Sequence, residues 1–511
     1  MSIFNTDKRI KLGIWGLGRG GNFFKSASFL NIDVVAGCDI HQEIRERFQK
    51  EAPNTFCTDD PEKFLACDMD AVLIATYLPD HARHILMALE AGKHVLCEVI
   101  PFRTPADAVR IVEAVEKSGK IFNLLENYPY SKENMYVQKL WQEGFFGDFM
   151  YGEFEYLHEA RVLAYGYNSF PTIPVTPGYT VHNWRADLNI HYYCTHSLGP
   201  AMYITGLRPT AVSALKDEVT LTGALRHATA APAMIKMSNG GLVRNLMGST
   251  TSDYHRGMRI WGTKAAAENF DKLKIRTGAS GSNGIVYEID AKFPTLNEEA
   301  EKAGHWGGDF WELYFFAREF FTGEPAFWNI YRACDVTLAG IMAIRSERQD
   351  GKLIEIPDFR DKNIRDLYRN DNGEQTRLFD PENIFPEGHD KTLTSQYTKV
   401  MCELFPRRKG GLVQLKNVFD GIKLVMDARN TSAMVELHNA VNQVIRELPQ
   451  MYENIQIAQQ IADKYPDSLP GKKLREVLDN WDIDKILNYE QTISELRDWQ
   501  NFFSTQSWFL Q

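Results

Sequence analysis

The chain has 511 residues, which is too many for one ordinary hydrophobic core, so two or three domains are expected. Its formal net charge of −10 argues against nucleic acid and membrane surfaces as partners, because both are bound by basic surfaces. The seven cysteines are widely spaced without a CxxC pair, and no run of about eighteen apolar residues and no apolar leader occurs. A disulfide scaffold and a membrane span are therefore not expected, and a cytoplasmic protein is predicted.

Strands and helices alternate over residues 1–127. Strands are expected at 10–16, 33–38, 71–76, 94–99 and 121–127. Helices are expected between them, from about residue 22 onward and at 41–51, 80–91 and 105–118. Because this alternation is typical of a doubly wound parallel sheet, residues 1–127 are predicted to form a Rossmann domain of the α/β class.

The pattern changes over residues 128–368. Helices are expected at 131–144, 309–323 and 331–347, and strand-like segments at 149–159, 233–250 and 256–270. The pair Gly240 and Gly241 is expected to turn a hairpin. A second, α+β domain is therefore predicted here, with an open, mostly antiparallel sheet that carries its helices on one face.

The remaining residues, 369–511, are predicted to form a mostly helical C-terminal extension. It begins with the polar stretch RNDNGEQTR, which is typical of a linker, and continues with apolar residues spaced three and four apart. The extension is either a dimer interface or lid, or simply a packing extension of the fold.

A glycine-rich motif follows the first strand. Gly16-Leu17-Gly18-Arg19-Gly20-Gly21 fits GxGxxG through Gly16, Gly18 and Gly21, and it opens a helix, which is the context that binding of a dinucleotide diphosphate requires. Asp39 ends the next strand, where a carboxylate accepts hydrogen bonds from the adenine ribose and repels a 2′-phosphate. NAD is therefore the predicted cofactor. The alternative is a structural turn in which Asp39 caps a helix.

Four segments resemble the Gfo/Idh/MocA oxidoreductase family over about the first 360 residues. They are GLGRGG, the CD at 38–39, AT-x-x-PDHA at 75–82 and EAGKHVLCE at 90–98. In typical dehydrogenases of that family Glu is followed by Lys-Pro, whereas Val99 and Ile100 follow Glu98 here. The family's Asp four residues before its active-site His is also replaced, by Tyr192 before His196.

A branch of that family, glycoside hydrolase family 109, which cleaves glycosides with bound NAD, resembles the chain more closely. The similar segments are Leu125-Glu126-Asn127, Tyr156 with His158, Trp184-Arg185, Tyr193 to Pro200, and Tyr254. The resemblance implies that NAD is contacted by the glycine motif, including Arg19, Gly20 and Gly21, and by Asp39, His81, Glu98, Val99 and Asn127. It implies that the sugar is contacted by Glu126, Tyr156, His158, Arg185, Tyr193, Thr195, His196 and Tyr254.

The chemistry implied by this resemblance is glycoside cleavage without net redox. The sugar is oxidised at C3, loses its C2 proton and C1 substituent, adds water and is reduced again. His196 is predicted to act near C3 because imidazole titrates near neutrality. Tyr156 or Tyr193 is predicted at C2, with Arg185 beside it because a neighbouring cation lowers the pKa of a phenol.

Simpler interpretations of these residues remain open. A tyrosine in a strand is often only packing, and a histidine can be structural. A metal site is not expected, because the histidines at 158, 182, 191 and 196 form no HExxH or closely paired motif. The alternative functions are a conventional NAD-dependent sugar or cyclitol dehydrogenase that releases NADH, and a non-catalytic NAD-binding protein. The expected partner is a small sugar or glycoside, and a homo-oligomer is expected.

Overall fold

The computed structural model describes residues 3–158, 189–217, 230–249, 255–278, 284–374, 385–397, 400, 411–428 and 433–505. Contacts divide the chain into two compact units, each of which is described by itself. The first comprises residues 1–158, 189–218 and 228–375, and the second contains residues 376–511 together with 159–188 and 219–227.

The N-terminal part of the first unit is a six-stranded parallel sheet. Its strands are β1 (Ile10–Trp15), β2 (Ile32–Cys38), β3 (Phe56–Thr58), β4 (Ala71–Ile74), β5 (His94–Glu98) and β6 (Phe122–Leu125). They follow the order β3-β2-β1-β4-β5-β6. Every residue of β4 and β6 is buried, because helices cover both faces of such a sheet. The predicted doubly wound sheet is confirmed, and the short β3 is an addition to it.

Helical segments connect these strands. They are η1 (Gly20–Phe23), α1 (Phe24–Phe29), α2 (Gln42–Glu51), α3 (Pro61–Leu65), η2 (Leu78–Asp80), α4 (His81–Glu90) and α5 (Pro105–Ser118). In α5 the Thr104 side chain accepts a hydrogen bond from the Asp107 amide, Pro105 occupies the first turn, and Gly119 ends the helix with a φ of 64°. These local signals explain why the predicted bounds of α5 match the observed ones.

The second sheet of this unit has nine strands. They are β7 (Phe149–His158), β8 (Pro209–Ala214), β9 (Ala230–Met237), β10 (Leu242–Ser249), β11 (His255–Gly262), β12 (Ala265–Asn269), β13 (Leu273–Thr277), β14 (Val286–Ile289) and β15 (Ile354–Glu355). All neighbours are antiparallel except β7 and β10. Gly240 turns the predicted hairpin between β9 and β10 with a φ of 89°.

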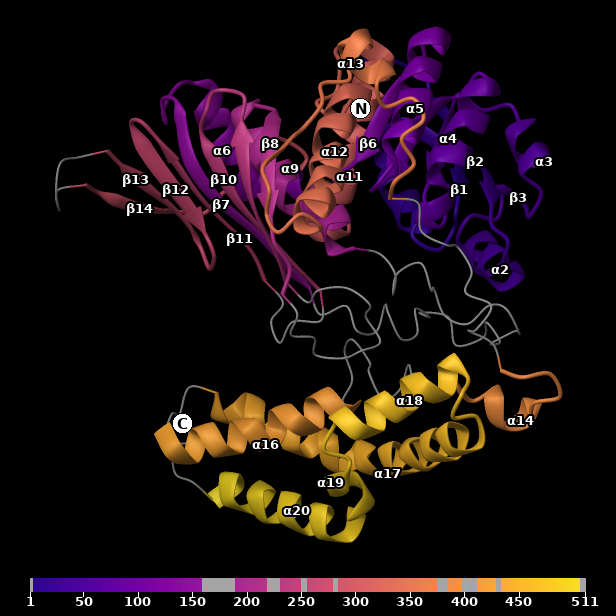
Figure 1. Cartoon of the computed structure of the whole chain (residues 1–511), viewed down its shortest axis with the longest axis vertical. Coiled ribbons are helices and arrows are strands. Elements are labelled where there is room, and N and C mark those ends of the chain that lie inside the picture. Colours follow the sequence, from indigo (N-terminus) through magenta and orange to yellow (C-terminus); the bar gives the residue numbers. More distant parts are fainter. Residues whose placement is uncertain are drawn as a thin grey trace. The chain divides into compact units, whose positions relative to one another are not determined.

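The remaining helical segments of this unit position the site. They are η3 (Tyr128–Tyr130), α6 (Lys132–Gln142), η4 (Ile190–Cys194), α9 (Thr195–Thr205), α10 (Asn297–Glu301), η6 (His305–Gly307), α11 (Gly308–Thr322), α12 (Ile330–Glu347) and α13 (Lys362–Asp366). Helix α9 packs on β7 and β10, and α12 packs on both β8 and β6, so α12 lies between the two sheets (Figure 1). Since α12 is covered on both sides, nearly all of its residues are buried.

The first unit continues past residue 368, where the sequence predicts that the C-terminal extension begins. Arg345 on α12 forms ion pairs with Asp371, at 2.8 Å, and with Glu374, at 2.7 Å. Glu374 is 4% exposed. Composition identifies this stretch as polar, but it cannot show that two of its carboxylates have a cationic partner on α12.

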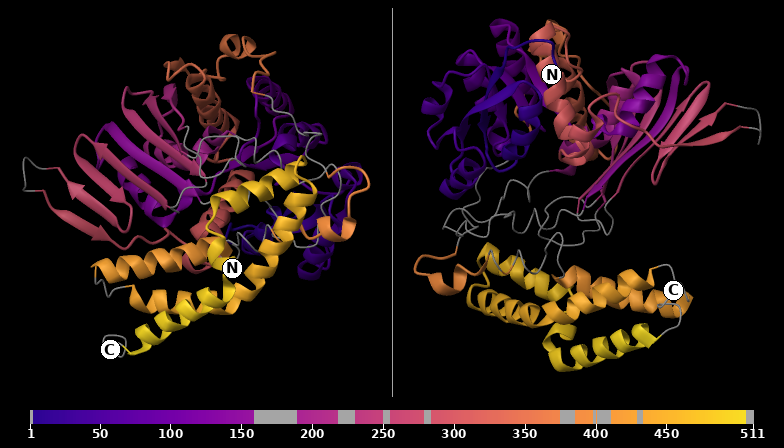
Figure 2. Two further views of the ribbon diagram at one scale, coloured as in Figure 1. Left: turned by 60° about the horizontal axis from the view of Figure 1, so that its bottom comes forward. Right: turned by 180° about the vertical axis from the view of Figure 1, so that it is seen from behind.

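The described part of the second unit is helical, as the sequence predicts for the C-terminal extension. Its described helices are α14 (Lys391–Thr394), α16 (Gly411–Ala428), α17 (Met434–Lys464), α18 (Leu469–Asn480), α19 (Asp484–Leu487) and α20 (Tyr489–Thr505). The 31-residue α17 packs against α16, α18 and α20, as Figure 2 shows. Its residues Val441, Val444, Leu448 and Met451 are buried at three- and four-residue spacing. None of the helices in the described part of the chain has the length and apolar character needed to cross a bilayer.

Candidate functional site

The glycine motif forms a tight turn at the carboxyl ends of β1 and β4. Gly16 has a φ of +93°, and a Cβ there would lie 2.3 Å from the carbonyl oxygen of Ala75. A Cβ on Gly20 would lie 2.6 Å from a methyl group of Ile14. Side chains at Gly16 and Gly20 would therefore fill the space enclosed by this turn, the glycine cradle. Its place at the start of a helical segment, at the carboxyl edge of a parallel sheet, fits the diphosphate of a dinucleotide.

Asp39 follows β2 beside this turn. Its Oδ2 accepts a hydrogen bond from the Leu17 amide at 2.9 Å, and its Oδ1 accepts one from the His41 amide at 2.9 Å. Burial raises the pKa of Asp39, and the two amides oppose that shift. The carboxylate thus braces the glycine turn, and its remaining lone pairs can accept hydrogen bonds from ribose hydroxyls.

Other predicted cofactor residues lie along the same edge of the sheet. The His81 ring, 2% exposed, bonds the carbonyl oxygens of Ile100 at 2.9 Å and Thr76 at 3.1 Å, so it braces two loops. Glu98 ends β5, and Val99 follows it. Asn127 is buried, and its Oδ1 has no hydrogen-bond partner among the residues that the structure describes. Such a buried carbonyl oxygen can accept a hydrogen bond from a cofactor amide.

Arg19 connects the glycine turn to two acidic residues from other elements. Its Nε lies 2.7 Å from Glu98 Oε1, and its two terminal nitrogens donate to both oxygens of Asp309 on α11 at 2.7 and 2.8 Å. Burial acts to raise the pKa of Asp309, but Arg19 and His305 together hold it below its ordinary value. Asp309 is therefore ionised and forms a bidentate pair with Arg19.

Glu312, one turn further along α11, lies beside these charges. It is 3% exposed, and neither carboxyl oxygen has a hydrogen-bond partner in the described part of the protein. Burial, followed by the charges of Asp309 and Glu98, raises the pKa of Glu312 well above its ordinary value. Burial therefore favours the neutral form of this carboxyl group.

The predicted catalytic residues come together at the start of α9. His196 Nδ1 lies 2.9 Å from Oε1 of Glu126, which follows β6. Glu126 is fully buried and also accepts a hydrogen bond from the Tyr128 amide. Because the carboxylate only accepts hydrogen bonds, this pair places the proton on Nδ1 and turns Nε2 away from Glu126.

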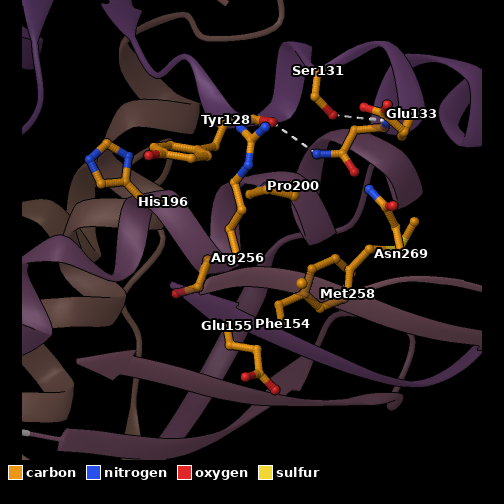
Figure 3. A pocket seen from close by; sticks show the side chains of 13 residues that line it. Tyr128, Ser131, Glu133, Phe154, Glu155, His196, Pro200, Arg256, Met258 and Asn269 are labelled. Carbon is orange, nitrogen blue, oxygen red and sulfur yellow. Dashed lines mark hydrogen bonds between the residues drawn. The ribbon is translucent and has the colours of Figure 1, made fainter. Parts of the chain in front are cut away.

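Aromatic rings surround His196. The ring centroids of Tyr128, Tyr156 and Tyr193 lie 4.7, 4.8 and 5.9 Å from that of the imidazole. His158 shares a strand face with Tyr156, at 5.7 Å between ring centroids. Figure 3 shows the His196 imidazole beside the Tyr128 ring. The three predicted catalytic residues are thus brought together.

The remaining predicted sugar contacts are placed differently. Thr195 is fully buried, and its hydroxyl has no partner among the described side chains and backbone. Arg185 and Tyr254, like Trp184, lie outside the described residues. Tyr192, which stands where the family has Asp, donates its hydroxyl to the Arg103 carbonyl oxygen at 2.8 Å. His196 therefore takes its carboxylate partner from the end of β6 and not from its own helical segment.

Several residues at the site are not predicted from the sequence. A small, open recess is lined by Tyr128, Glu155, His196 and Arg256 among others. Arg256 also lies over the ring of Trp306, with Cζ 3.2 Å from the ring centroid. Tyr128 follows the Leu-Glu-Asn segment, but no spacing rule connects it with Arg256 or Trp306. Among the residues that the structure describes, no group of three or more His, Cys, Asp or Glu side chains could hold a metal ion.

Sequence comparisons agree with these features. Residues 10–125 match a family model, GFO_IDH_MocA, described as an oxidoreductase family with an NAD-binding Rossmann fold. A glycosyl hydrolase family 109 protein of Shewanella putrefaciens is 25% identical over 399 residues, covering 68% of this chain and 85% of that protein. An alpha-N-acetylgalactosaminidase of Shewanella oneidensis is 24% identical over the same length and coverage.

Solved structures share the fold. Levoglucosan dehydrogenase in complex with NADH and L-sorbose superimposes with a TM-score of 0.59 at 17% identity, covering 69% of this chain and 100% of that one. An inositol dehydrogenase homolog from Azotobacter vinelandii, complexed with NAD+, gives 0.56 at 17% identity, covering 69% and 98%.

The predicted resemblance and cofactor are thereby confirmed. The glycine cradle, the braced Asp39 and the buried Asn127 oxygen fit NAD, which the neighbouring structures hold on the same fold. Residues 10–125 thus match the GFO_IDH_MocA family model and have the geometry of an NAD-binding Rossmann domain, and the chain resembles this oxidoreductase family.

Proposed function

We propose that this protein is an NAD-dependent enzyme that cleaves a glycoside without net redox. The observation that carries the proposal is the buried Glu126–His196 pair with Tyr156 beside it, next to the carboxyl edge of the NAD-binding sheet. Two proton-transfer groups at neighbouring positions are what an elimination next to an oxidised carbon requires.

The chain's own residues supply positioning and proton transfer. Glu126 holds the His196 ring through Nδ1, so that Nε2 can take a proton from a sugar hydroxyl, and Glu126 is thus a positioning residue. Tyr156 provides the second proton-transfer group, at a ring carbon next to that hydroxyl. Bound NAD would supply a reversible two-electron oxidation of the sugar, which makes the neighbouring C–H acidic.

The choice of a glycosidase over a dehydrogenase depends on sequence features and relatives. Val99 stands where dehydrogenases of the family have Lys, and Tyr192 stands where they have Asp. The curated relatives include a glycosyl hydrolase family 109 protein and an alpha-N-acetylgalactosaminidase. The structural neighbours include sugar dehydrogenases, so a conventional dehydrogenase with net NADH production is the second candidate.

Substitutions of the central pair test the proposal. His196→Ala should lower kcat by about 10²- to 10⁴-fold, because it removes the base, and Glu126→Gln should lower kcat less, because it only loosens the orientation of the ring. KM for the glycoside should change little in Glu126→Gln. The measurement is steady-state hydrolysis of the best substrate from a nitrophenyl glycoside panel.

Tyr192→Phe is the matched control, because it removes a hydroxyl four residues from His196. Among the described residues, that hydroxyl bonds to the backbone carbonyl oxygens of Arg103 and Glu374. Its kcat should equal that of the wild type. Full activity in His196→Ala would refute the assignment. An equal loss in Tyr192→Phe would show that the effect comes from the local fold.

A further inference from the structure

Trp306 is presented to solvent by an unusual stretch of backbone. His305, Trp306 and Gly307 have consecutive φ values of 51°, 55° and 92°. Two of these residues carry side chains that disfavour the left-handed region, at a cost of roughly 1–2 kcal/mol each. Trp306 is nevertheless 49% exposed. The fold thus holds a large aromatic ring in the open, at a cost in backbone strain.

The surrounding structure enforces this conformation. A Cβ on Gly304 would lie 2.4 Å from an Asp309 oxygen, and one on Gly308 would lie 2.6 Å from the Asn127 carbonyl oxygen. His305 Nδ1 lies 2.9 Å from Asp309. The turn is therefore packed against the cofactor edge of the sheet, and strain of this kind concentrates at ligand sites.

One face of the Trp306 ring is covered by Arg256. The guanidinium carbon lies 3.2 Å from the Trp306 ring centroid and 5.4 Å from that of Tyr128. Tyr128 lies 6.3 Å from Trp306 and 4.7 Å from His196, centroid to centroid. A row of rings thus leads from solvent at Trp306, through Tyr128, to the proposed base.

We infer that Trp306, backed by Arg256, is the platform on which a ring in the leaving group of the glycoside stacks. This inference rests on the proposed function. The reacting sugar lies at His196, and its C1 substituent is the part that extends outward. The flat indole face suits the apolar C–H face of a pyranose or the face of an aryl group. The ring thereby selects glycosides with cyclic leaving groups over simple alkyl glycosides.

Binding measurements test this platform without depending on turnover. The probes are methyl and 4-nitrophenyl glycosides of N-acetylgalactosamine, galactose and glucose, in both anomers, and the matching disaccharides. They are titrated calorimetrically into the full-length, NAD-loaded His196→Ala variant, in which the expected loss of the base slows their turnover by about 10²- to 10⁴-fold. Trp306→Ala, Trp306→Gly and Trp306→Phe are added to that background, and Gly removes the ring while accepting the left-handed backbone.

The nitrophenyl glycoside should bind about tenfold more weakly to Trp306→Ala and Trp306→Gly, because both variants lack the ring. Trp306→Phe should retain most of the affinity for the nitrophenyl glycoside. Binding of the methyl glycoside should be the same in all of these variants. Trp261→Ala is the control, because Trp261 is also partly exposed and lies on the same strand as Arg256. If only the disaccharides lose affinity, the platform takes a sugar ring and not an aryl ring.

Three results distinguish a failure of the proposed platform from a failure of the proposed function. Equal losses for methyl and nitrophenyl glycosides, or none for any cyclic leaving group, would overturn the platform and leave the proposed function standing. A loss specific to Trp306 with a glycoside that the wild type does not cleave would support the platform and contradict the proposed function. Absence of binding by every probe would contradict both.

Discussion

Glu312 gives the buried acidic cluster a measurable pH dependence. Burial, followed by the charges of Asp309 and Glu98, raises the pKa of its carboxyl group in the folded protein. Arg19 acts in the opposite direction, and Glu126 adds to the rise. An unfolded glutamate loses its proton near its ordinary pKa of 4.5. The wild-type protein should therefore lose up to about 1.4 kcal/mol of stability per pH unit as the pH rises above that value.

Glu312→Gln has no proton to lose and should escape this loss. Its melting temperature relative to the wild type should increase as the pH rises above the ordinary pKa of glutamate. The measurement is thermal unfolding with saturating NAD across that pH range, and Glu90→Gln, at an exposed position on α4, is the control. Parallel profiles for Glu312→Gln and the wild type would show that the carboxyl group is ionised in the fold.

Some residues of the cofactor and sugar sites could be predicted from the sequence, and others could not. Gly16 and Asp39 could be predicted because the dinucleotide turn has a fixed local geometry that only certain residues adopt. His196 and Tyr156 could be predicted from the family resemblance. The partners of Arg19 could not, because Asp309 lies 290 residues away and no local pattern connects them.

At the scale of elements, the Arg19–Asp309 pair ties the glycine turn to the start of α11. Both groups are largely buried, so removing one charge leaves the other inadequately paired, at a cost of roughly 3–5 kcal/mol. Asp309→Asn should therefore release NAD faster than the wild type and lower the melting temperature. The release rate can be followed by dilution of the NAD-loaded protein into a competing dehydrogenase assay.

Asp68→Asn is the control for that experiment, because it breaks an ion pair with Lys11 whose carboxylate is 89% exposed. Exposed pairs contribute little, so both NAD release and melting should remain unchanged. Unchanged NAD release in Asp309→Asn would mean that the pair stabilises α11 without acting on the cofactor turn.

Elements with strong local signals were predictable, and pairings were not. The bounds of α5 follow from Thr104, Pro105 and Gly119. The parallel pairing of β7 with β10 inside an antiparallel sheet depends on contacts between strands about 90 residues apart, which periodicity does not encode. For the same reason the sequence could not show that the first unit extends to residue 375.

At the scale of the whole molecule, two compact units divide the chain, and the NAD-binding sheet and the His196 cluster both belong to the first. The helical second unit was predictable because its buried residues keep the three- and four-residue spacing of amphipathic helices. The proposed activity is therefore assigned to the described residues of the first unit.

The central claim is that NAD assists glycoside cleavage and is regenerated in each turnover. The most direct test incubates the full-length, NAD-loaded protein with a panel of α- and β-nitrophenyl glycosides, without added NAD, and follows nitrophenolate release and reduced nicotinamide together. The account predicts many turnovers of nitrophenolate per enzyme with no net NADH. Absence of release, with NADH accumulating once free sugars and NAD are supplied, would contradict it and identify a conventional sugar dehydrogenase.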